Sequence, residues 1–263
     1  IEDDPLFAVR LALMPTIGFV LGMVLRSPMV MIFPIMMFSL MAGNRKAFDA
    51  RRVLGAPVAF SAMLWMMSAL FALFYQLPLA LVLLMGLVYF AGFYMIQATG
   101  NAMGMLFIVS AALISIMGLG SYPAMTYLRS EMTKAGLCVA IVASILYMLL
   151  PVRTPELNVD EYVPSDESGR IVRAAIRAVV MLAFSLYLYT ILDFNNVMLG
   201  IAGMFILVFS TREEIWQEVV QRGFAAILGG VLSLAILGLL MVSGHLVVLL
   251  ALTFLVTLWL AHK

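Results

Sequence analysis

Residues 77–98 read LPLALVLLMGLVYFAGFYMIQA, a stretch without one charged side chain. A helix that crosses the hydrocarbon core of a bilayer needs about 20 consecutive apolar residues, and this stretch has that length. A strand of an outer-membrane barrel would alternate apolar and polar residues, whereas this run is apolar throughout. The stretch therefore predicts a transmembrane helix.

Comparable runs fill the rest of the chain. Of its 263 residues, 65% are hydrophobic and 11% are charged, against about 25% charged in a typical soluble domain. A soluble protein of this size has too few interior positions to bury so many apolar side chains. We predict an all-α, polytopic membrane helical bundle, with candidate spans at residues 5–25, 28–43, 53–75, 77–98, 103–120, 134–152, 172–192, 195–210, 225–242 and 245–261.

Several classes of protein are disfavoured by the same composition. The net charge of +1 argues against a nucleic-acid partner, which would require a basic face. We find no His/Cys spacing typical of a metal site, no glycine-rich phosphate loop, and no nucleophile beside a base. We therefore expect no enzyme activity, no metal and no cofactor. Because the chain starts at Ile1 and its apolar pattern stops abruptly at Lys263, we expect a piece of a longer protein.

Positive charge predicts the orientation in the membrane. Residues 44–52 contain four basic side chains, which favours the cytoplasmic side for this loop. Counting spans from this loop places the N-terminus, residues 153–170 and residues 211–222 in the cytoplasm as well. Residues 153–170 are rich in proline and acidic side chains, which is typical of a solvated linker.

The two halves of the sequence share a pattern. Arg10 precedes Arg26 by the same number of residues that separates Arg177 from Asp193, and a short candidate span follows each pair. An even number of spans separates the copies, so we predict two parallel six-helix repeats related by an axis along the membrane normal. Residues 1–152 would form the first repeat, 153–170 the linker, and 171–263 a second repeat of which four helices are present.

This layout resembles the fusaric acid resistance and aromatic acid exporter family. The resemblance covers about residues 6–60 and 170–235, and rests on an arginine-bearing helix, a short helix, a basic loop and the sequence RVLGA at 52–56. It implies efflux of aromatic carboxylic acids across a bacterial inner membrane, beside a periplasmic adaptor and an outer-membrane channel. The layout is also similar to plant malate channels, which implies anion conduction and a homodimer. Better-known exporters carry a large cytoplasmic domain after the sixth helix, where this chain has only the 153–170 linker.

The paired short spans, 28–43 and 195–210, are the predicted binding site. At 1.5 Å per residue each reaches about 24 Å, short of a bilayer core of about 30 Å. We expect Pro34 to interrupt the first span. The N-terminal ends of such helices favour anions, and Asn195 and Asn196 would either cap the second helix or bind the ligand.

Arginines near the ends of the long spans are the second group of candidate site residues. Arg10 lies about one turn inside its predicted helix, and Arg173 and Arg177 occupy the equivalent region of the second half. They would either extend to lipid headgroups or form a cationic entrance that binds a carboxylate through two hydrogen bonds. Asp193 is the candidate for proton coupling, which needs an intramembrane titratable group.

From the sequence we therefore expect a secondary transporter that exports small amphipathic organic anions. An organic-anion channel on the same scaffold would show the same arginines and short helices without needing a titratable residue. A membrane scaffold subunit that transports nothing is the third interpretation, in which these arginines pair with acidic side chains or lipid.

Overall fold

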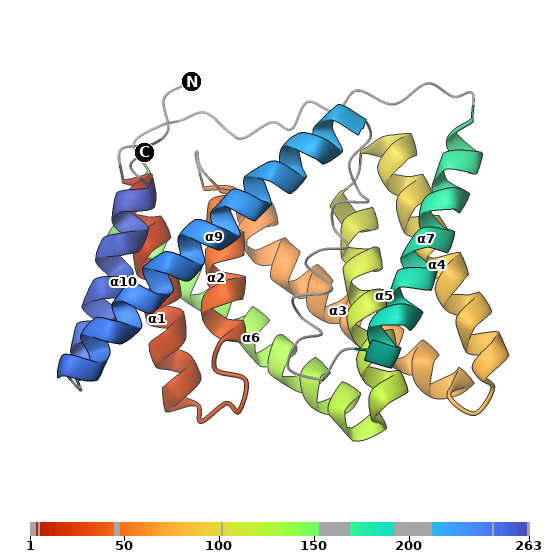
Figure 1. Cartoon of the computed structure of the whole chain (residues 1–263), viewed down its shortest axis with the longest axis horizontal. Coiled ribbons are helices and arrows are strands. Elements are labelled where there is room, and N and C mark those ends of the chain that lie inside the picture. Colours follow the sequence, from red (N-terminus) through yellow and green to blue (C-terminus); the bar gives the residue numbers. More distant parts are fainter. Residues whose placement is uncertain are drawn as a thin grey trace. The chain divides into compact units, whose positions relative to one another are not determined.

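The computed structural model describes residue 4 and residues 6–44, 48–100, 102–152, 169–191, 212–243 and 245–261. Most of these residues form helices (Figure 1). In chain order the helices are α1 (Phe7–Val24), α2 (Ile32–Ala42), α3 (Ala50–Phe74), α4 (Pro78–Thr99), α5 (Ala102–Gly120), α6 (Tyr122–Leu149), α7 (Arg170–Ile191), α9 (Arg212–Ser243) and α10 (Leu246–Ala261).

The helices are suited to an apolar solvent. Within the described ranges, seven are long and apolar enough to cross a membrane, whereas α2 and α10 are shorter. Large apolar side chains stay on the surface: Leu79 is 77% exposed and Met148 is 82% exposed. Lipid accepts such side chains, and a helix satisfies its own backbone hydrogen bonds, which lipid cannot do. The predicted all-α membrane bundle is confirmed.

Two predicted helix boundaries are wrong. The sixth helix begins at Tyr122 and not at residue 134, so Arg129 and Glu131 lie inside α6 instead of in a loop before it. Pro123 is the second residue of α6, where a missing N–H removes no helical hydrogen bond. Likewise α9 begins at Arg212, so the predicted loop at 211–222 is helical from that residue onward.

The described chain separates into two compact units. Unit 1 consists of Ile1–Val58, Glu131–Asp160 and Gly223–Lys263, and unit 2 consists of Ala59–Ser130 and Glu161–Arg222. Each unit therefore takes residues from both predicted repeats. The predicted short span at 195–210 lies outside the described residues, and the two-repeat organisation stays a prediction.

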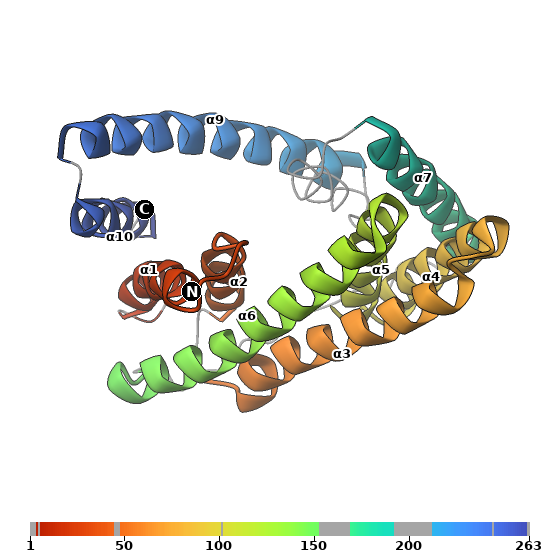
Figure 2. The ribbon, with the colours of Figure 1, turned by 90° about the horizontal axis from the view of Figure 1, so that it is seen from below.

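In unit 1, α1 packs against α2 and against α10 (Figure 2). The buried core of this unit joins α1 and α2 to the second half of α6, which supplies Val139, Ala143, Leu146 and Tyr147. The short helix α2 spans only about 16 Å, at 1.5 Å for each of its 11 residues. The prediction of a short second helix is confirmed.

In unit 2, α4 packs against both α5 and α7. Gly92 of α4 and Gly104 of α5 let two backbones approach closely, since a Cβ atom at Gly104 would lie 2.6 Å from the carbonyl oxygen of Gly92. Small residues at crossings are the common way to pack helices tightly in lipid.

A hydroxyl cluster links the same three helices. The buried Tyr89 hydroxyl of α4 lies 3.3 Å from Ser115 Oγ of α5 and 3.0 Å from Ser185 Oγ of α7. The two serines also donate to backbone carbonyls of their own helices, Ser115 to Ala112 and Ser185 to Met181. The cluster therefore gives every hydroxyl a partner in an apolar interior, where an unpaired one would be costly.

We expect Gly104→Ala to force α4 and α5 apart, because the new methyl group would overlap the Gly92 carbonyl. The expected loss is about 1–3 kcal/mol in the free energy of unfolding, measured by denaturant titration of the chain in detergent micelles. Gly120→Ala is the matched control, since it lies at the end of the same helix with nothing within 4 Å of its Cβ position. Equal stability of the two variants would contradict the close α4–α5 contact.

Candidate functional site

Arg10 is a fully buried charged side chain of unit 1. It lies in the first turn of α1, about where the sequence predicts it, and its exposed fraction is 0%. A side chain that extends to lipid headgroups would have an accessible guanidinium, so this interpretation of Arg10 is wrong. The burial of a full charge in apolar surroundings requires compensating partners.

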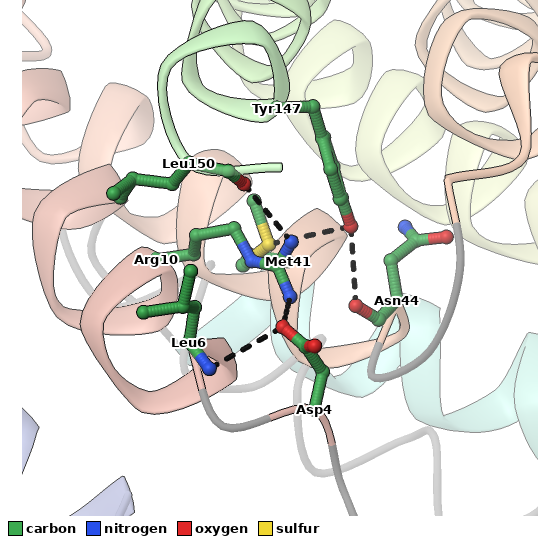
Figure 3. Close-up of polar contacts among 7 residues, drawn as sticks. All are labelled: Asp4, Leu6, Arg10, Met41, Asn44, Tyr147 and Leu150. Carbon is green, nitrogen blue, oxygen red and sulfur yellow. Dashed lines mark hydrogen bonds and ion pairs between the residues drawn. The ribbon is translucent and has the colours of Figure 1, made fainter. Parts of the chain in front are cut away.

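Those partners come from two segments of unit 1, the chain before α1 and the end of α6 (Figure 3). Arg10 Nη2 forms an ion pair with Asp4 Oδ2 at 2.5 Å, and Arg10 Nη1 donates to the Leu150 carbonyl oxygen at 3.3 Å, just after α6. The guanidinium carbon lies 4.8 Å from the centre of the Tyr147 ring, within the range of a cation–π contact. One carboxylate, one carbonyl and one aromatic face therefore compensate the charge.

Tyr147 is itself held in place by α2 and the segment after it. Its hydroxyl donates to the Asn44 carbonyl oxygen at 3.2 Å and contacts the Met41 sulfur at 3.8 Å. On its ring, Phe48 packs at a centroid distance of 4.9 Å. The end of the short helix α2 thus positions the aromatic face that covers Arg10.

The guanidinium keeps unused capacity for a second hydrogen bond on one edge. Arg10 Nε is buried and has no hydrogen-bond acceptor among the residues that the structure describes. Asp4 contacts the group through Nη2, so the Nε–Nη2 edge is only half used. This edge matches the geometry of a carboxylate that accepts two parallel hydrogen bonds.

The other predicted site residues lie elsewhere. Arg173 is exposed and Arg177 is half-buried, both on α7 in unit 2. Pro34 does not interrupt a helix, because it is the third residue of α2, where its missing N–H would have no helical acceptor. Asn195, Asn196 and Asp193 lie outside the described residues. The contacts of Arg10 in unit 1 instead bring in Asp4 and Tyr147, with Asn44 bound to Tyr147, which the sequence did not indicate.

Glu131 is a further buried charged residue that the sequence did not indicate. The side chain of Glu131 in α6 is 2% exposed, and its Oε1 forms an ion pair with Lys134 Nζ at 2.7 Å. Its other oxygen, Oε2, accepts a 2.5 Å hydrogen bond from Ser27 Oγ in the turn between α1 and α2. The three-residue separation of Glu131 and Lys134 is typical of a helical ion pair. That spacing, together with Pro123 as a start signal, was the available evidence for a longer α6.

The nearby Arg129 belongs to unit 2 and has a different environment. Its Nη1 donates to Ser68 Oγ of α3 at 2.9 Å, and its guanidinium carbon lies 3.8 Å from the centre of the Trp65 ring. Polar and aromatic partners therefore compensate this charge inside a long apolar helix.

In comparisons with known proteins, no family model matches this chain, and no curated protein or solved structure matches it either. The function has to be argued from the site itself.

We expect Asp4→Asn to destabilise unit 1, because it leaves the buried Arg10 charge with neutral partners only. Breaking a buried ion pair from one side costs about 3–5 kcal/mol. Denaturant unfolding in detergent micelles measures the loss. Asp49→Asn is the matched control: Asp49 Oδ1 accepts the Arg51 N–H at the start of α3, and asparagine caps a helix equally well.

The double variant Asp4→Asn/Arg10→Gln distinguishes the stability lost through an unpaired buried charge from that lost through altered side-chain packing. It contains no buried charge at these positions, so it should recover most of the stability that Asp4→Asn loses. A single Asp4→Asn variant as stable as the wild type would contradict the buried pair.

Proposed function

We propose that this chain is a secondary transporter that exports small amphipathic organic anions, aromatic carboxylic acids in particular. The observation that supports the proposal is the buried Arg10 guanidinium with an unused Nε, set against an aromatic ring inside a membrane protein. Ionisable groups inside membrane proteins are costly and are commonly functional. The carboxylate of such a substrate would bind Arg10, and its aromatic ring would pack against Tyr147.

The exchange of carboxylates provides a route for transport. In the structure Asp4 forms an ion pair with Arg10, which neutralises the guanidinium charge when no substrate is bound. A substrate carboxylate that replaces Asp4 would restore the same charge balance, so the protein would not expose an uncompensated arginine during exchange. We place this step in a bacterial inner membrane with the N-terminus in the cytoplasm, and we propose an adaptor and an outer-membrane channel as partners.

The experiment is flux of a hydroxybenzoate into proteoliposomes that contain the full chain. Arg10→Gln should lower the initial rate at subsaturating substrate by about tenfold or more, since a hydrogen bond to a charged group contributes roughly 1.5–3 kcal/mol. Arg10→Lys should recover only part of the rate, because lysine keeps the charge but lacks the planar pair of donors. Arg26→Gln is the control, because it removes an exposed arginine near the other end of α1.

The same assay separates the alternatives. Saturable flux that follows an imposed pH gradient supports a coupled exporter, whereas flux that follows membrane potential alone supports an organic-anion channel. Absence of flux above that of empty liposomes, with folded protein verified by its unfolding transition, would overturn transport by this chain alone and favour a scaffold subunit. Equal rates in Arg10→Gln and Arg26→Gln would remove Arg10 from the site.

A further inference from the structure

Glu131 is a buried carboxylate within a membrane-length helix, and both of its oxygens are occupied. Lys134 Nζ lies 2.7 Å from Oε1, and Ser27 Oγ lies 2.5 Å from Oε2. The two members of the ion pair differ in exposure, because the Lys134 side chain is 60% exposed while that of Glu131 is 2% exposed. The lysine can leave toward solvent or lipid headgroups, and the carboxylate cannot follow it.

Ser27 ties this carboxylate to the turn between α1 and α2. Its Oγ donates to Glu131 and accepts a hydrogen bond from the Met29 N–H at 3.2 Å. The Ser27 side chain therefore links the carboxylate of α6 to the backbone of the turn. The turn ends α1 with the Ser27 N–H bonded to the Gly22 carbonyl and the Arg26 N–H bonded to the Met23 carbonyl. This is the Schellman pattern, which places Arg26 in the left-handed region at φ 49°.

The left-handed position is unfavourable for arginine and is normally taken by glycine. Such a conformation persists where surrounding contacts enforce it. Within unit 1 the bond between Ser27 and the Glu131 carboxylate adds to the two backbone hydrogen bonds that hold this turn. One of the contacts that keep Arg26 in this conformation is therefore a hydrogen bond whose strength depends on the charge of Glu131.

We infer that Glu131 is a proton-binding residue whose ionised form holds the α1–α2 turn and whose protonated form releases it. A proton taken from water neutralises the carboxylate, the Lys134 ammonium moves to the accessible surface, and the Ser27 bond loses its charge assistance. Besides Lys134 on its own helix, Ser27 from the turn is the group that contacts this carboxylate among the described residues. The inference rests on the proposed transport function, to which it adds the coupling ion and the segment that moves.

The test uses the full chain in lipid nanodiscs with a spin label at Arg26→Cys in a Cys138→Ser background. Acidification should increase the mobility of the label in otherwise unchanged protein. In Glu131→Gln the label should be mobile at every pH, because the neutral amide resembles the protonated acid. Asp49→Asn removes a carboxylate elsewhere in unit 1 and should keep the original response.

A second readout follows the proton itself. Infrared spectroscopy should detect a protonated carboxyl band that appears on acidification and is lost in Glu131→Gln. Ser27→Ala should keep this band while the label stays mobile throughout, because the acid remains and only its link to the turn is removed. Two results would overturn the inference. One is label mobility that still changes with pH in Glu131→Gln, and the other is label mobility that does not change with pH in the protein that keeps Glu131.

These outcomes are independent of the flux assay. A label response that depends on Glu131, in a chain that shows no anion flux, would support the proton site and refute the transport function. Flux without any such response would leave the transporter in place and refute Glu131 as its proton-binding residue.

Discussion

The lack of water around most of this chain is the constraint on which the rest of the structure depends. Backbone groups that cannot bond to solvent must bond to each other, which yields helices. Side-chain charges obey the same rule more strictly, because an uncompensated charge in lipid is far costlier than an unpaired amide. The charged side chains of the site follow it: the buried Arg10 pairs with the buried Asp4, the buried Glu131 pairs with Lys134, and the half-buried Arg129 lies against Trp65 and Ser68.

In unit 1 these compensations also organise the packing of α1. Near its start, Arg10 bonds to the carbonyl that follows α6, and just after its end Ser27 bonds to Glu131 in the middle of α6. Helix α1 therefore runs antiparallel to the second half of α6, with polar contacts near both of its ends and an apolar core between them. Because one contact involves an anion-binding group and the other a titratable acid, substrate and proton would act on the same helix from opposite ends.

The sequence predicted the fold class and most helix positions, because apolar runs of membrane length are a strong signal. It failed where charge interrupts such a run: Arg129 and Glu131 were predicted to lie in a loop before residue 134, whereas polar partners accommodate them inside α6. These partners are Ser68 for Arg129, and Ser27 and Lys134 for Glu131. Arg10 was predicted from its position alone. Its partners Asp4 and Tyr147, and Asn44, which accepts from Tyr147, are separated from one another by long stretches of chain, and no local pattern predicts such a meeting. Pro34 was misinterpreted because a proline at the third helical position and one at a break look alike in sequence.

The proposed transport depends on one step, in which Arg10 exchanges the carboxylate of Asp4 for that of a bound anion. Equilibrium binding of a hydroxybenzoate to the full chain in nanodiscs, compared between wild type and Asp4→Asn, tests it most directly. Removal of the internal competitor should tighten binding, because the ligand then meets an arginine that no carboxylate occupies. Binding that is unchanged or weaker in Asp4→Asn would contradict this exchange and make the Arg10–Asp4 pair a structural feature only.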